Sequence, residues 1–223
     1  MGFVPELDEK RKAATREKIL KTALHMFSEK TIDAVNLKEI SKEAGIGMAT
    51  VYRHFDKKPD LVLAVSAWSW EQYRLGNALK VDKAGMTAAE YFEFYLESFI
   101  DLYRNHRDIL RFNQYFNAYV KREGIPHDRM KPYEDVINSL EERFHQNYLL
   151  GEKDGTLRTD ISEKRMFATT LHLMLAAVTR YAVGLVYDVG IDPEEELDVL
   201  KKMLMREYTS DLIVTPSYTG GVS

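Results

Sequence analysis

The side chains with the chemistry to recognise another molecule gather in one short stretch, residues 47–55. On a helical wheel Val51 and Phe55 form an i,i+4 pair that would face a core. The side chains on the opposite side of this helix or at its margins would be free to meet a partner: Met48, Ala49, Thr50, Tyr52 and Arg53. A small residue at the centre of this face, Ala49, would let the helix approach a surface closely.

Arg53 is the long cationic donor of this face, so it is the main candidate for reading a base. A guanidinium group can form two hydrogen bonds with the edge of a guanine, while hydroxyl groups such as those of Thr50 and Tyr52 suit the phosphate backbone. A second interpretation of Arg53 is an ion pair with a phosphate or a carboxylate at the rim of the helix. The sequence leaves both interpretations open.

The preceding residues, 36–45, would position this helix. Asn36 and Glu39 have the spacing of a capping box, which starts a helix at residue 37. Gly45 stands where that helix must stop and turn, a position that favours a residue without Cβ. Two short helices joined by a glycine turn are typical of a helix-turn-helix, although any small helical hairpin shows the same pattern.

Residues 19–62 carry a more specific combination: the pair Ala44-Gly45, the run Thr50-Val51-Tyr52, Phe55, and a lysine, Lys58, ahead of the next helix. In these features the segment resembles the N-terminal DNA-binding domain of the TetR family of transcriptional regulators. The resemblance implies that Lys58, and also Lys38, contact phosphates of double-stranded DNA. Gly47 and Met48 depart from the family's pattern, in which a hydroxyl residue and a polar residue are common, so we expect fewer direct base contacts.

The composition excludes several classes of protein. The chain has 223 residues, no cysteine and a formal net charge of −4. Disulfides and thiolate metal sites are therefore excluded, and a reducing cytoplasm is the expected location. Residues 1–60 hold 12 Lys or Arg and 10 Asp or Glu, a net charge of +2, which leaves −6 for the remainder. This division of charge fits a protein whose N-terminal domain binds DNA and whose remaining domain binds an effector. We call residues 1–58 the head and residues 59–223 the body.

Every recognisable periodicity is helical, so the expected fold is all-α. We expect a DNA-binding domain over residues 1–58, whose first helix covers residues 15–29, and an effector-binding and dimerisation domain over residues 59–223. An apolar helix over residues 166–187 is interrupted by His172 and Arg180, which argues against a membrane span. We expect this helix and the last one, which Asp192 would cap, to form a homodimer.

The second half lacks the spacing of catalytic motifs: HExxH, GxSxG, a phosphate-binding loop and a glycine-rich dinucleotide motif are all missing. The six histidines are scattered and no two are four residues apart, so we expect no metal, no cofactor and no enzyme.

Aromatic side chains with a few polar groups are typical of a small-molecule site, and the resemblance implies an effector. The candidate effector-binding residues are Phe99, Tyr103, Phe112, Asn113, Tyr115, Phe116, Asn117, Tyr119, Phe144, Tyr148 and His172. The same aromatic pattern also fits a plain core, and His172 also fits a satisfied core histidine. The expected function is a ligand-responsive dimeric regulator, most simply a repressor, that binds a palindromic operator and is released by a small, mainly apolar effector. The alternative is a DNA-binding protein whose body docks a protein partner and binds no small molecule.

Overall fold

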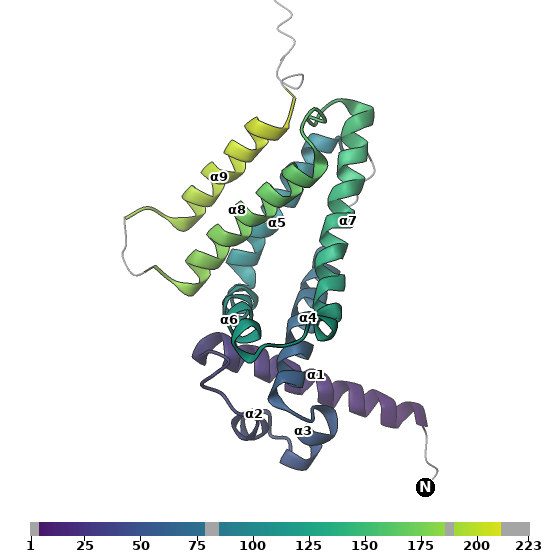
Figure 1. Ribbon diagram of the computed structural model, residues 1–223, viewed down its shortest axis with the longest axis vertical. Helices are drawn as coiled ribbons and strands as arrows, with labels where there is room; N and C mark the ends of the chain where they lie inside the picture. The colour runs from purple at the N-terminus through teal and green to yellow at the C-terminus, as the bar shows by residue number, and fades with distance from the viewer. Residues whose placement is uncertain (1–4, 79–84, 186–189, 211–223) are drawn as a thin grey trace, which may run out of the picture. The chain divides into compact units, whose positions relative to one another are not determined.

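A computed structural model describes residues 5–78, 85–185 and 190–210, and within these ranges the regular elements are helices (Figure 1). The all-α prediction is confirmed. In chain order the elements are α1 (Pro5–Lys30), α2 (Leu37–Ala44), α3 (Met48–His54), α4 (Lys58–Ala78), α5 (Ala88–Asn105), α6 (Arg107–Glu123), the 3₁₀ helix η1 (His127–Met130), α7 (Lys131–Asp154), α8 (Glu163–Val183) and α9 (Pro193–Tyr208).

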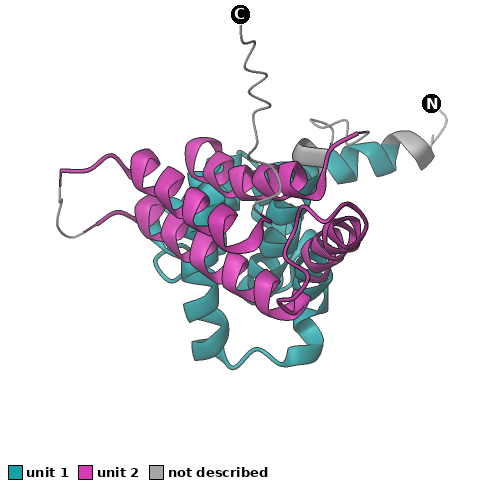
Figure 2. Cartoon of the chain, turned by 90° about the horizontal axis from the view of Figure 1, so that it is seen from above, with its two compact units in different colours: residues 1–80, 106–137 teal, residues 81–105, 138–223 magenta. Residues whose placement is uncertain are grey.

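The chain divides into two compact units, each built from two segments (Figure 2). The first unit comprises residues 1–80 and 106–137, and the second comprises residues 81–105 and 138–223. The first unit therefore contains α4 and α6 in addition to the three helices of the predicted DNA-binding domain. The functional boundary after residue 58 stays a prediction, because compactness and function need not divide a chain at the same place.

Stacked aromatic rings join α1 to α6 in the first unit. Phe112 lies between Phe27 and Phe116, with ring centroids 6.1 and 5.7 Å apart, and all three side chains are at most 1% exposed. Arg111 also pairs with Glu29, and Arg122 with Asp33, but these side chains are about one-third to one-half exposed. Solvent screens exposed ion pairs and leaves them weak, so the buried rings dominate this contact.

Helix α1 begins at Pro5, ten residues before the predicted start at residue 15. The extension has no buried side chain among Asp8–Lys18, so an apolar periodicity could not reveal it. Good helix formers and local pairs hold it instead, with Lys12 Nζ at 2.9 Å from Glu9 and 3.3 Å from Asp8.

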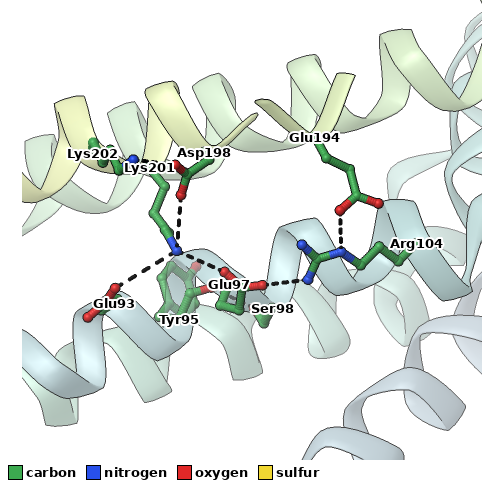
Figure 3. A network of polar contacts seen from close by, with 9 residues as sticks. All are labelled: Glu93, Tyr95, Glu97, Ser98, Arg104, Glu194, Asp198, Lys201 and Lys202. Atoms are coloured by element: carbon green, nitrogen blue, oxygen red, sulfur yellow. Dashed lines mark hydrogen bonds and ion pairs between the residues drawn. The ribbon is translucent and has the colours of Figure 1, made fainter. Parts of the chain in front are cut away.

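The second unit packs α5 against α8 and α9, and a charged network fixes α9 along α5 (Figure 3). Lys201 lies 3.1 Å from Glu97 and 3.4 Å from Asp198, and Arg104 bridges Glu97 and Glu194. Burial lowers the pKa of Lys201, but the hydrogen bonds and charges of Glu97 and Asp198 outweigh it, so the pKa lies above its ordinary value. Lys201 is therefore charged in this network at neutral pH.

Helices α8 and α9 lie close to the positions that the sequence predicts for the last two helices. Asp192 caps α9 as predicted, accepting a hydrogen bond from the Glu194 N–H at 2.7 Å, and Pro193 is the first residue of the helix. Helix α8 starts at Glu163, and its described end is Val183; residues 186 and 187 of the predicted helix lie outside the described residues. By length and apolarity α8 also passes the test for a membrane span, as core helices of soluble proteins do.

Candidate nucleic-acid interface and effector site

Helix α2 and the turn after it are fixed by side-chain hydrogen bonds. Asn36 Oδ1 accepts from the Glu39 N–H at 3.0 Å, and Glu39 Oε2 accepts from the Asn36 N–H at 2.9 Å, which confirms the predicted capping box. Gly45 has φ +61°, the left-handed conformation in which glycine is favoured. The Ser41 hydroxyl donates to the Ile46 carbonyl at 2.6 Å across the turn. These bonds set where α3 starts relative to α2.

Helix α3 has one buried face and one exposed face, as predicted. Val51 and Phe55 are 0% and 3% exposed, whereas Tyr52 is 52% exposed and Arg53 and Ala49 are also exposed. Met48 and Thr50 are half-buried at the margins. The face therefore presents a small residue at its centre and a tyrosine and an arginine beside it.

Basic side chains converge at the carboxyl end of α3. Arg53 donates to the Thr50 hydroxyl at 2.8 Å, and the Arg16 guanidinium from α1 lies 5.1 Å above the Phe55 ring. Burial lowers the pKa of His54, and the charges of Arg16, Arg53 and Lys12 lower it further. His54 is a member of this cluster that sequence reasoning missed, because its nearness to α1 depends on tertiary packing.

Two lysines are expected from the resemblance to contact phosphates, and they differ in solvent exposure. Lys38 is exposed on α2, whereas Lys58 is half-buried and its Nζ lies 3.4 Å from the Asp33 carbonyl oxygen. Burial lowers the pKa of Lys58, although the nearby charges of Asp33 and Glu123 oppose this effect. Phosphate contact by either lysine stays a prediction, with Lys38 the more accessible of the two.

Gly47 begins α3 without a side-chain cap. A serine or threonine at this position would supply a hydroxyl to the first turn, so the expected loss of a hydrogen-bonding group is present in the structure. The exposed N–H groups of a helix start can still meet a phosphate, but α3 has only seven residues, and its specificity must come from its side chains.

The predicted effector residues are distributed over both units. In the first unit Phe112, Phe116 and Tyr119 are buried, Tyr115 is half-buried, and Asn113 Oδ1 accepts a hydrogen bond from Tyr133 at 3.2 Å. Burial raises the pKa of Tyr119 to about 12, with the nearby charges of Glu123 and Asp33 adding to the effect.

Asn117 is exposed in the single chain, so the structure does not bury it with Asn113, and its place in an effector site stays a prediction. Its spacing of four residues from Asn113 puts both on one side of α6, so the difference in burial depends on what packs along the helix.

In the second unit Phe99, Tyr103, Phe144 and Tyr148 are buried. Phe99 and Phe144 both contact Tyr95, with centroids 5.3 and 5.7 Å apart. The Tyr148 hydroxyl lies 2.9 Å from the Ile161 carbonyl oxygen.

His172 is exposed on α8 in the single chain, so the structure does not bring it together with the buried effector candidates, and its role stays a prediction. The buried stripe of α8 passes through Thr170 and Met174, and His172 points away from it.

Two open depressions lie on the surface of the second unit, with volumes of about 360 and 340 Å³. Glu90, Glu93 and Glu97 line one, and His145 and Glu163 line the other. None of the predicted effector residues lines either depression. The sequence did not predict that two polar side chains, Asn147 and Thr170, are buried. In a helical pattern a buried polar residue cannot be told from a polar residue that faces solvent.

A capped helix, a glycine turn and a short helix with an exposed polar face form a helix-turn-helix, the motif with which many proteins bind DNA. Residues 19–65 match the profile of "Bacterial regulatory proteins, tetR family". Two HTH-type transcriptional regulators of Staphylococcus aureus are 42% identical over 50 residues and 44% identical over 46 residues. These matches cover 22% and 21% of this chain and 27% and 25% of the relatives. Residues 19–65 are therefore similar to the DNA-binding domain of TetR-family transcriptional regulators.

Solved structures of the same fold cover more of the chain. A TetR-family regulator from Vibrio parahaemolyticus has a TM-score of 0.67 at 14% identity over 88% of this chain and 99% of its own. The fatty acid degradation regulator FadR from Bacillus halodurans has a TM-score of 0.68 at 14% identity, covering 85% and 94%. AibR, solved with isovaleryl coenzyme A and operator DNA, has a TM-score of 0.62 at 13% identity, covering 86% and 98%. At these identities the likeness establishes the fold.

Proposed function

We propose that this chain is a cytoplasmic, dimeric repressor that binds a palindromic DNA operator and is released by a small, mainly apolar effector. The observation that carries the proposal is the exposed face of α3, where Arg53 and Tyr52 stand beside the small Ala49. This face belongs to the part of the chain that matches the regulator family. We therefore expect its exposed hydrogen-bond donors to bind double-stranded DNA.

Arg53 is the base reader in this proposal. Within the described part of the chain its side chain hydrogen-bonds to Thr50 and pairs with no carboxylate. A weak, exposed hydrogen bond to a hydroxyl can be exchanged for two bonds to a guanine at little cost. Arg16 and Lys12, at the other side of His54, would contact the phosphate backbone and supply affinity that does not depend on sequence.

The homodimer would form through the exposed apolar side chains of α8 and α9. Leu173 and Val183 on α8 are 44% and 42% exposed, and Val199 and Met203 on α9 are 55% and 57% exposed. Val199 and Met203 are four residues apart, so they lie on one face of α9. A second copy of the chain is the partner we propose, because two heads must bind half-sites about 34–36 Å apart on a palindrome.

The proposal of a small effector is supported by the fold and by the aromatic interior of the body. AibR carries isovaleryl coenzyme A, and a regulator from Saccharomonospora viridis with a TM-score of 0.64 and 18% identity, covering 89% and 99%, carries choline. An effector that binds one conformation of the body better would lower operator affinity by the coupling free energy between the two sites.

Arg53→Ala tests the DNA-binding assignment, with Lys38→Ala as a matched control on the neighbouring helix. We compare the operator with duplexes that are altered at one base pair. Arg53→Ala should reduce the difference in binding free energy between them by about 1–3 kcal/mol. Lys38→Ala should weaken binding to all sequences alike and lower the salt slope by about one. Fluorescence anisotropy on operator and scrambled duplexes at several salt concentrations measures both. Unchanged sequence preference in Arg53→Ala would show that Arg53 does not read a base.

A further inference from the structure

Two buried polar side chains of the second unit have no hydrogen-bond partner among the described residues. Asn147 on α7 is 3% exposed, and neither its Nδ2 nor its Oδ1 is bonded. Thr170 on α8 is 0% exposed, and its Oγ1 is also unbonded. A buried amide or hydroxyl that has left water without gaining a partner carries a free-energy penalty. A ligand that bonds to these groups would remove it.

Burial alone does not explain why these groups are unpaired. Asn113, the other asparagine in the buried core, is 4% exposed and bonds to Tyr133. The buried Tyr148, one residue after Asn147, bonds to the Thr159 and Ile161 carbonyls at 3.0 and 2.9 Å. Most buried polar groups in native proteins are satisfied, so an unsatisfied one calls for a partner, such as a ligand or an ordered water.

An aromatic cluster joins the two helices that carry the unpaired side chains. Phe144 on α7 contacts Phe167 on α8 and Tyr95 on α5, with centroids 5.4 and 5.7 Å apart. Asn147 follows Phe144 by three residues and Thr170 follows Phe167 by three, so each lies one turn from this contact on the buried face of its helix. Helix α7 meets α5 and α8 through these long side chains and not through close backbone approach. Rotamer changes of the rings can therefore admit a flat apolar molecule.

The electrostatics of this interior select an uncharged ligand. The buried polar residues described in this unit are the neutral Asn147, Thr170 and Thr179. A charged group placed among them would lose its hydration without gaining a counter-charge, which is strongly unfavourable. The amide of Asn147 offers a donor and an acceptor side by side, which match the acceptor and donor of another amide.

We propose that Asn147 and Thr170 are the polar contacts of the effector site, and that they select a neutral compound with a flat apolar body and one carboxamide-like edge. Asn147 pairs with that edge through two hydrogen bonds, Thr170 bonds to a second polar atom, and the aromatic cluster holds the apolar body. This inference rests on the proposed function, since it names the ligand class of the proposed effector site.

A matched series of probes tests the ligand class on the full chain. The series is 2-naphthamide, 2-naphthoate and naphthalene, which share one ring system and differ in the polar edge. Isothermal titration calorimetry should show 2-naphthamide binding at least about tenfold more tightly than either of the others, a factor equivalent to about 1.4 kcal/mol. Tighter binding of 2-naphthoate, or no binding of 2-naphthamide up to its solubility limit, overturns the proposal.

Asn147→Leu tests the residue, with Asn113→Leu as the matched control. In Asn147→Leu we expect the preference for 2-naphthamide over naphthalene to vanish, and the urea midpoint of unfolding to rise, because an unsatisfied amide is replaced by an apolar group of similar size. In Asn113→Leu the midpoint should fall, because Tyr133 loses its acceptor. Thr170→Val should weaken 2-naphthamide less than Asn147→Leu does. A lowered midpoint or a retained preference in Asn147→Leu contradicts the assignment.

Operator binding by the unaltered chain distinguishes a wrong ligand class from a wrong proposed function. If the ligand tests fail while the chain binds a selected operator, the ligand class is wrong and the proposed regulator stands. If the chain binds no operator, the proposed function fails whatever the probes do.

Discussion

His145 on α7 and Glu163 at the start of α8 form an ion pair whose strength depends on pH. His145 Nδ1 lies 3.0 Å from a carboxylate oxygen of Glu163, and this hydrogen bond and its charge raise the pKa of His145 above its ordinary value of 6.5. Because the folded pKa is the higher one, the folded chain binds the proton more tightly than the unfolded chain. The stabilisation is fully present below pH 6.5 and is lost as the pH rises through the folded pKa.

His145→Gln should therefore lower the melting temperature at acidic pH and leave it nearly unchanged at alkaline pH. Differential scanning calorimetry of both proteins between about pH 5 and 8.5 measures the difference. A difference that grows as the pH rises would mean that the pair does not carry this stabilisation.

Residue positions on α3 could be predicted from the sequence, whereas those deeper in the body could not. Val51 and Phe55 face inward and Tyr52 and Arg53 outward because apolar residues four apart lie on one face of a short helix. His172 proved exposed because α8 is apolar on more than one side, so its helical wheel does not identify a single inner face. Asn117 is exposed although it lies four residues after the buried Asn113, because burial along one helix face depends on which elements pack against it.

At the scale of elements, α7 approaches the loop after it so closely that only glycine fits at residue 151. A Cβ on Gly151 would lie 2.7 Å from Leu157 Cβ and 3.3 Å from its Cδ1. Leu157 is 2% exposed, so it has no free space into which to move. This contact sets how α7 turns into the segment that leads to α8.

Gly151→Ala should lower the free energy of unfolding by about 1–3 kcal/mol through overpacking, even though alanine is the better helix former. Chemical denaturation measures the change. In Gly151→Ala/Leu157→Gly the loss of stability should be smaller than the sum of the two single losses, because removal of the Leu157 side chain, Cβ included, leaves room for the new methyl group. Full additivity would show that the two residues do not compete for space.

Helix types and most boundaries were predictable because capping residues and apolar periodicity are local signals. The first turns of α1 were missed because a helix held by local charge pairs has no apolar stripe. The aromatic contact between Phe27 and Phe112 could not be predicted, since it joins residues far apart in the chain and depends on how the helices pack.

At the scale of the whole molecule, the proposed dimer depends on the apolar face of α8 and α9. Met203→Glu places a charge at a position that is 57% exposed in the single chain, so the folded monomer should tolerate it. In the dimer the carboxylate would be buried without a partner and would weaken association by several kcal/mol. Light scattering after size exclusion should then show a monomer, while circular dichroism stays unchanged. A dimer of unaltered affinity would exclude this face as the interface.

The division of the chain into units was the least predictable feature. A sequence is read as contiguous segments, whereas each compact unit here combines two separated segments. The family assignment rests on residues 19–65, which explains why the head could be interpreted residue by residue and the body only by composition.

Selection of operators from a random DNA library by the full chain tests the central claim most directly. We predict enrichment of one inverted repeat with half-sites about one helical turn apart, bound with an affinity that falls as salt rises. The enriched half-site should contain a guanine that Arg53 contacts. Replacing this guanine should weaken binding of the unaltered chain but leave binding of Arg53→Ala unchanged. Failure to enrich any sequence would contradict the account of the head, and enrichment of a single unrepeated site would contradict the dimer.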